Sequence, residues 1–235
     1  MTENIEGIII RIRDYRDNDL ILDVVSNKYG LISLIAKGAK KPLAKLHFSV
    51  SGLYEFTINY LEDKTIFSLI NSKEIKIFIK YDNSLLNAFA SVFYEILYKL
   101  KELCDSSSYD NLLFFLENIN GENYFLLGCI FMSYINRLYG IEPYVDGCVR
   151  CQSKKVVSIS NEFGGFVCKS HSDGFNPYSL DTLKSFRIIC KCTYKNYNEI
   201  KDLKIGNDLF KCLCDFFIYN SDIKLKSYEF FERLI

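Results

Sequence analysis

The first eighty residues alternate hydrophobic and polar side chains with the period of two that is typical of half-buried β-strands. Strands are predicted at residues 8–12, 20–25, 31–37, 53–61 and 66–70. The connection at 27–30 is short, so the second and third strands are expected to form a hairpin. Five short strands with a break in the middle favour a small barrel, and the five-stranded oligonucleotide-binding (OB) barrel is one architecture of this size.

The rest of the chain changes to a helical period, with apolar residues three and four positions apart. Helices are predicted at residues 84–103, 109–119, 122–139, 178–192, 207–219 and 225–234. Residues 144–173 interrupt the pattern, because they are rich in Gly, Ser and Cys and show no helical period. We therefore expect an α+β protein. Its expected domains are a barrel at 1–80, a helical domain in two parts at 81–143 and 174–235, and an insert at 144–173.

The composition is that of a folded chain and points to no particular partner. Hydrophobic residues make up 49% of the 235 residues, which excludes a disordered or collagen-like chain. Lys and Arg number 29, as do Asp and Glu, so the net charge is zero and any attraction to nucleic acid has to be local. No segment reaches the roughly 20 apolar residues that span a bilayer. The acidic N-terminus also lacks the basic region of a signal peptide, so we expect a cytoplasmic protein with no membrane association.

The predicted insert contains two pairs of metal-ligand residues. Cys148 and Cys151 form a CxxC pair, and Cys168 and His171 form a second pair with the same spacing. This spacing lets both side chains of a turn reach one ion, and two such pairs around a short hairpin are typical of tetrahedral zinc sites. We predict a structural zinc ion, because four protein ligands leave no position for a substrate water. Unliganded thiols in a loop are the other interpretation.

A one-signed cationic run lies between residues 28 and 54, where there are five lysines and no acidic residue. Together with arginines of the first strand and its turn, these lysines are predicted to contact DNA phosphates. The predicted contacts are Arg11, Arg13, Arg16, Lys28, Lys37, Lys40, Lys41 and Lys45. Taken alone, the run is typical of a solvated loop. On an OB-type barrel it favours nucleic-acid binding.

A weaker cationic row, Lys184, Arg187 and Lys191, lies on one face of a predicted helix. Leu183 and Phe186 flank the row, so cations stand beside apolar groups. An acidic peptide with a terminal aromatic residue suits such a surface. An ordinary solvated helix face is the other interpretation.

The common catalytic motifs GxxxxGK[ST], GxGxxG, HExxH and GxSxG are all missing from the sequence. The chain has only two histidines, one in the proposed zinc set and the other, His47, in the cationic run. A catalytic triad therefore lacks a histidine base. We expect no enzymatic activity. A metal-dependent nuclease or zinc hydrolase is one alternative, and a barrel that binds a peptide as an interaction scaffold is another.

Four runs of this sequence resemble the RecO family of bacterial DNA repair proteins. They lie at residues 7–21, 28–41, 139–151 and 223–231, in the family's order and over nearly the whole chain. The third run leads into the family's zinc insert, contains Cys148 and ends at Cys151. One departure is His171, at the position where the family usually has a fourth Cys; zinc accepts either ligand.

The resemblance implies a recombination mediator with an N-terminal OB barrel, a helical domain and a zinc insert. Members of the family bind single- and double-stranded DNA and anneal complementary strands. They act with RecR and contact the acidic C-terminal tail of single-stranded DNA-binding protein (SSB), and so help RecA to load on coated strands. The resemblance therefore supplies a candidate peptide for the Lys184 row and a nucleoid-associated location in the cytoplasm.

Overall fold

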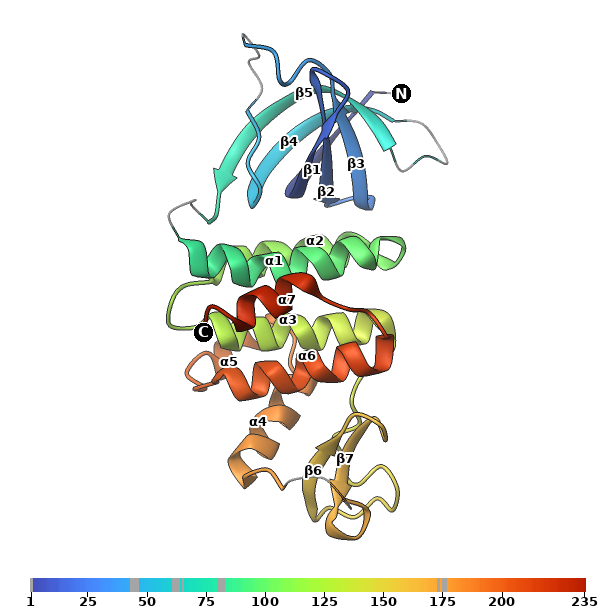
Figure 1. The fold of residues 1–235 in the computed structure, drawn as a ribbon, viewed down its shortest axis with the longest axis vertical. Coiled ribbons are helices and arrows are strands. Elements are labelled where there is room, and N and C mark those ends of the chain that lie inside the picture. The colour runs from blue at the N-terminus through green and yellow to red at the C-terminus, as the bar shows by residue number, and fades with distance from the viewer. Residues whose placement is uncertain are drawn as a thin grey trace. The chain divides into compact units, whose positions relative to one another are not determined.

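The structure is a computed structural model that describes residues 2–42, 47–60, 64, 66–79, 83–172, 174 and 177–235. The chain divides into two compact units (Figure 1). The first combines Met1–Asn118 with Lys226–Ile235, and the second is Ile119–Leu225. Each unit is described by itself. The four-part division of the sequence into domains stays a prediction.

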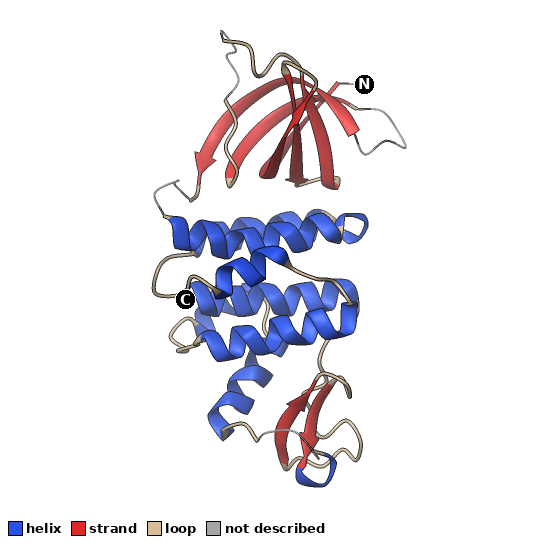
Figure 2. Ribbon diagram, viewed as in Figure 1, coloured by secondary structure: helices blue, strands red, loops and turns tan. Residues whose placement is uncertain are grey.

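The N-terminal strands form a closed barrel, as the alternating pattern predicts (Figure 2). The strands are β1 (Thr2–Tyr15), β2 (Asp19–Ser26), β3 (Gly30–Ala36), β4 (Gly52–Asn59) and β5 (Ile66–Ile77). Their order around the barrel is β1-β2-β3-β5-β4, with β3 and β5 parallel and the other pairs antiparallel. This is the five-stranded OB-type architecture expected from the sequence.

A β-bulge in β1 changes which side chains enter the barrel. Ile5 and Ile9 lie in the core, and the next core-facing residue is Ile12, not residue 11. The register shifts between Ile9 and Arg11, where an extra residue opposes one residue of β2. Strict alternation along 8–12 therefore fails, and Ile8 and Ile10 are buried outside the barrel core.

Among its described residues, the first unit also contains the helices α1 (Ser84–Lys99), α2 (Ser106–Asn118) and α7 (Lys226–Glu232), and the short 3-10 turn Lys101–Leu103. Asn83 caps α1 through its side-chain oxygen, which accepts a hydrogen bond from the Leu86 N–H. Helix α1 buries its apolar stripe, including Phe89 and Phe93, and α7 adds Phe231 to the same aromatic cluster. Gly30 is needed where the barrel meets these helices, because a Cβ there would lie 2.0 Å from the Cys104 carbonyl oxygen.

Glu95 of α1 caps the beginning of α7. Its carboxylate accepts hydrogen bonds from the backbone N–H of Lys226 (3.2 Å) and of Ser227 (2.8 Å), and from the Ser227 hydroxyl (2.5 Å). Lys99 Nζ lies 3.2 Å from the same carboxylate. The first N–H groups of a helix have no intrahelical acceptor, so this contact stabilises the position of α7.

Replacing Glu95 with Ala is expected to lower the free energy of unfolding by about 1 kcal/mol, the usual effect of losing a cap. Burial opposes ionisation of Glu95, but the Ser227 hydrogen bonds outweigh it and lower the pKa below the ordinary 4.5. The stabilisation is therefore present above that ordinary value and is lost as the pH falls through the lowered pKa. Urea unfolding of the wild type and of Glu95→Ala should converge at acidic pH. Exposed Glu102 provides the matched control variant, and a difference that stays constant with pH would contradict the cap.

The second unit packs helices against a small two-stranded sheet. Its helices are α3 (Tyr124–Tyr139), α4 (Leu180–Lys191), α5 (Tyr197–Ile200) and α6 (Asn207–Ser221), and its strands are β6 (Val156–Ser160) and β7 (Gly165–Cys168). The sequence pattern did not predict α5 or the 3-10 turns Lys169–His171 and Tyr194–Asn196, because single turns are too short to show a period. Within the parts of the chain that the structure describes, no helix combines the length and the hydropathy needed to cross a membrane.

Candidate metal centre and cationic surface

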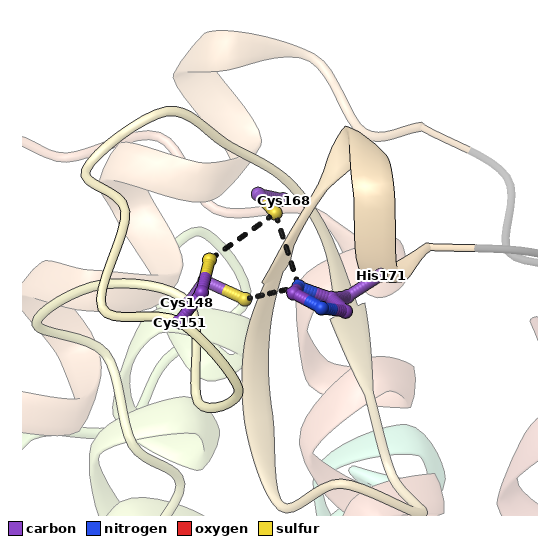
Figure 3. Close-up of side chains that lie close together, drawn as sticks. All are labelled: Cys148, Cys151, Cys168 and His171. Carbon is purple, nitrogen blue, oxygen red and sulfur yellow. Dashed lines mark hydrogen bonds between the residues drawn. The ribbon is translucent and has the colours of Figure 1, made fainter.

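The four predicted metal ligands come together in the second unit. Cys148 and Cys151 lie in the loop before β6, Cys168 ends β7, and His171 lies in the 3-10 turn that follows. Their ligand atoms all lie within 4.8 Å of one another. Figure 3 shows the three sulfurs and the imidazole ring facing a common centre.

Backbone hydrogen bonds shape the loop that carries Cys148 and Cys151. The Gln152 N–H donates to the Cys148 carbonyl (2.8 Å), and the Cys148 N–H donates to the Ser153 carbonyl (2.9 Å). Gln152 adopts a left-handed conformation with φ of 61°, which closes the turn. The Val149 N–H then donates to the Phe166 carbonyl on β7 (2.8 Å), so the loop is tied to the strand that ends at Cys168.

The distances fit a tetrahedral zinc ion. Cys151 Sγ lies 3.7 Å from Cys168 Sγ, and His171 Nδ1 lies 3.4 Å from Cys168 Sγ and 3.5 Å from Cys148 Sγ. Zinc bonds of about 2.3 Å to sulfur and 2.0–2.1 Å to nitrogen give tetrahedron edges of about 3.8 Å between sulfurs and about 3.6 Å from sulfur to nitrogen. The set can therefore hold a metal ion, with Nδ1 as the histidine ligand atom.

The protein also favours the thiolate that a metal requires. Burial opposes ionisation of Cys148, yet three backbone N–H groups of the two turns and the His171 ring outweigh it and lower the pKa of this thiol to about 6. At Cys151, the Ser153 N–H favours the thiolate, but burial and the neighbouring sulfurs raise the pKa. Adjacent thiolates repel each other unless a cation lies between them, so a metal ion would allow all three to ionise.

Two members of the Lys184 row contact the insert that carries the metal ligands. Asp146 accepts from Arg187 Nη2 (2.8 Å) and from Lys191 Nζ (2.5 Å), and Arg187 Nε donates to the Val145 carbonyl (3.2 Å). Lys191 and Arg187 together lower the pKa of the Asp146 carboxyl. Lys184 is exposed and lies 3.9 Å from Asp181. Two of the three cations thus join α4 to the insert. Sequence patterns missed the contribution of Asp146, which is more than 40 positions away.

Seven of the eight predicted phosphate contacts are described, and they occupy three parts of the first unit. Arg16 lies in the β1–β2 turn, and Lys37, Lys40 and Lys41 lie in the turn after β3. A hydrogen bond from the Lys40 N–H to the Asn18 carbonyl (3.0 Å) joins these two turns. Lys28 lies at the other end of β3, roughly 20 Å away at the usual rise per residue. Arg11 and Arg13 lie on β1, and Lys45 falls outside the described residues.

Arg13 forms a two-point ion pair inside the barrel wall. Its Nη2 and Nε atoms donate to the two carboxylate oxygens of Asp23 at 2.8 Å and 3.1 Å. The Asp23 side chain is only 1% exposed and also accepts from the Ser33 hydroxyl (2.7 Å). The Arg13 side chain is 35% exposed. Its guanidinium therefore compensates a buried charge that would otherwise be costly.

Replacing Arg13 with Ala is expected to lower the free energy of unfolding by roughly 2–4 kcal/mol, because Asp23 loses the partner of its buried carboxylate. Chemical denaturation measures this loss. Arg16→Ala serves as the control, since Arg16 is exposed and stacks on the neighbouring Tyr15 ring. A variant that keeps its stability and loses only DNA affinity would instead make Arg13 a phosphate contact.

The other cations differ in how far they are already paired. Lys28 Nζ lies 2.7 Å from Glu3, and Lys40 Nζ lies 3.0 Å from Asp14. The structure describes no ion pair for Arg16, Lys37 or Lys41, and all three side chains are exposed. These three form the cationic barrel end, the part of the predicted set that is most available to an anion.

Two family profiles match this chain over most of its length. The profile "Recombination protein O N terminal" matches residues 1–78, and "Recombination protein O C terminal" matches residues 84–228. The chain belongs to the RecO family. The first match spans the barrel, and the second spans the metal centre.

Curated relatives in the family carry the name DNA repair protein RecO. The protein from Bacillus mycoides is 30% identical over 77% of this chain and 74% of its own length. The protein from Bacillus cytotoxicus is 26% identical over all of this chain and 98% of its own length. A third, from Bacillus cereus strain AH187, is 31% identical over 74% of this chain and 72% of the relative. The RecO family is thus named for DNA repair and recombination, in agreement with the resemblance seen in the sequence.

Proposed function

We propose that the protein is a non-enzymatic recombination mediator in DNA repair. It binds single- and double-stranded DNA, anneals complementary strands and, with RecR, helps RecA to load on strands coated by SSB. The observation that carries the proposal is membership of the RecO family over both units, together with a closed OB-type barrel. The proposed site of action is the nucleoid in the cytoplasm.

The barrel supplies the proposed DNA contacts. Arg16, Lys37 and Lys41 bind phosphates from one end of the barrel, where a backbone hydrogen bond joins their two turns and the three side chains have no carboxylate partner among the described residues. The turn that carries the lysines contains Gly38 and Ala39, so its backbone can approach a strand closely. Arg11 extends the cationic surface along β1. The positive charges of Lys28, Lys40 and Arg13 add to the attraction for DNA. To contact a phosphate directly, however, each of these side chains has to give up its ion pair with a carboxylate.

The proposed metal is zinc in a structural role, held by Cys148, Cys151, Cys168 and His171. Three thiolates and an imidazole suit zinc better than the oxygen-seeking metals of nucleases. A bound zinc ion supplies cross-linking of the two turns. The four protein ligands complete a tetrahedron, so a metal-dependent hydrolase lacks the open position it needs. Across the described ranges, no second group of three or more His, Cys, Asp or Glu residues is placed to hold a metal.

A partner's acidic peptide is proposed to bind at the Lys184 row, and the tail of SSB is the candidate. Lys191 and Asp146 line a cavity of about 580 Å³ with Pro143, Tyr144 and Val145. Asp146 already forms ion pairs with Arg187 and Lys191, so a peptide carboxylate has to displace the Asp146 carboxylate from them. RecR is proposed as the second protein partner.

Replacing Asp146 with Asn is expected to tighten binding of an acidic, aromatic-ended peptide several-fold, because two cations lose a competing carboxylate. Titration of a labelled peptide measures the change, and Asp202→Asn is the control, since Asp202 is an exposed carboxylate of the second unit that pairs with no member of the Lys184 row among the described residues. Weaker binding in Asp146→Asn would place the peptide elsewhere.

The proposed function is tested by strand annealing. Two complementary labelled strands should pair faster with the protein than without it, both free and coated with SSB. Products are also inspected for cleavage in the presence of magnesium or zinc. No acceleration under any condition would contradict the mediator, and cleavage that depends on the metal would support a nuclease. If the barrel binds a peptide and the protein binds no DNA, the result would support an interaction scaffold.

A further inference from the structure

A cavity of about 500 Å³ lies within the first unit, where the barrel meets α1 and the beginning of α7. Ile10, Val50 and Tyr94 form apolar walls, and Arg11, Lys99 and Lys226 bring three cations to it. These residues come from four separate segments of the chain. The volume falls within the range of roughly 300–1,000 Å³ that small-molecule sites occupy in proteins.

The positive charges around the cavity outnumber the negative charges among its described lining residues. Glu95 is the single carboxylate among its described lining residues, and it is engaged by Lys99 and by backbone N–H groups of α7. Arg11 makes no described ion pair, and its guanidinium lies 4.6 Å from the centre of the Tyr98 ring. Lys226 is exposed and likewise has no described ion pair. A local excess of positive charge therefore persists in a chain of zero net charge.

The aromatic and cationic groups are arranged for a flat ligand that carries an anion. Tyr98 presents a ring face that already stacks a guanidinium, and both groups bind the π-face of a nucleobase. The Tyr94 and Ser51 hydroxyls are hydrogen-bonded to each other at 2.6 Å. Tyr94 therefore contributes its aromatic ring to the cavity wall and no free polar group. Cations beside apolar walls match a base with its flanking phosphates.

We propose that this cavity holds one unpaired nucleotide of a DNA strand. The base lies against Tyr98 and the apolar walls, and the flanking phosphates contact Arg11 and Lys226. This rests on the proposed DNA-binding function and deepens it, because a base inside a duplex cannot enter. The cavity would therefore favour single strands over duplexes, while the cationic barrel end binds the backbone of either.

The test compares full-length wild type, Tyr98→Leu, Tyr98→Phe and Lys226→Glu on a labelled oligothymidylate and on the same strand with abasic sites. Wild type and Tyr98→Phe should bind the abasic strand about 5- to 150-fold more weakly, the range expected for one lost base stack. Tyr98→Leu should bind both strands alike, and Lys226→Glu should bind both more weakly. Arg233→Glu is the matched control, since Arg233 is exposed, follows α7 and does not line the cavity.

The outcomes separate this inference from the proposed function. If wild type binds no DNA, the proposed function fails and the cavity proposal with it. If wild type binds both strands equally and Tyr98→Leu changes nothing, the cavity proposal alone is overturned. Quenching of 2-aminopurine placed in the strand gives a second readout, which Tyr98→Leu should remove and Tyr98→Phe should retain. An acidic peptide that binds wild type but not Lys226→Glu, with strand binding unchanged, would assign the cavity to a protein partner and overturn the proposal.

Discussion

Cys148→Ser is expected to lose the bound metal and to unfold the loop and turn that carry the four ligands. Cys148 is a fully buried member of the quartet, and a serine hydroxyl ionises too weakly to replace a thiolate ligand. Structural zinc contributes about 10–16 kcal/mol of apparent binding free energy in small zinc domains, so losing one ligand of four has a large effect. The metal content of the purified protein should fall from about one ion per chain to nearly none.

The damage should stay local, and hydrogen exchange shows where it spreads. Residues 144–155 and 169–172 should lose protection, whereas the barrel should keep it because it has its own core. Part of the β6–β7 sheet should also survive, since Phe166 packs on Phe186 of α4 with ring centres 5.8 Å apart. Cys104→Ser is the control, as Cys104 lies outside the quartet. Purified wild type with no metal, prepared without chelators, would refute the metal centre.

Reversing Lys37 and Lys41 to Glu is expected to weaken binding to single strands of every sequence by a similar factor. Phosphate contacts carry no base information, so no sequence should be spared. Each lost contact reduces the slope of log affinity against log salt by about 0.7, so two lost contacts amount to roughly 25-fold at about 0.1 M salt. A salt titration with labelled strands of two unrelated sequences measures both quantities.

The control for this double variant is the reversal of Lys201 and Lys204, two exposed lysines of the second unit. It changes the net charge equally, so it separates a local contact from a general loss of attraction. Equal slopes for wild type and the Lys37 and Lys41 double variant would make the turn after β3 an ordinary solvated turn. A loss restricted to one strand sequence would point instead to base recognition.

The sequence predicted most of the elements because their signals are local. The alternation of Tyr54, Phe56 and Ile58 predicts β4, and all three are buried in the barrel core. The helical spacing of Phe89 and Phe93 predicts α1 in the same way. The two x2 spacings predicted which four side chains meet, because each pair lies in a single turn and a short hairpin brings the turns together.

Whether each cationic side chain is paired with a carboxylate or available to a ligand depends on the tertiary structure. Periodicity marks Arg13 and Lys28 as polar, but their carboxylate partners, Asp23 and Glu3, lie 10 and 25 positions away. The β1 bulge adds to this, since it turns Ile12 into the barrel where simple alternation would not. Spacing along one element carries no information about which distant residue faces it.

The sequence by itself determined the barrel, most of the helices and the composition of the metal quartet, each set by contacts within a turn or between neighbouring strands. Only the tertiary structure decided which cations remain available and where the cavity lies. The cavity exists because residues 10, 50, 94 and 226 meet in space, and chain closure over such separations is governed by packing of whole elements.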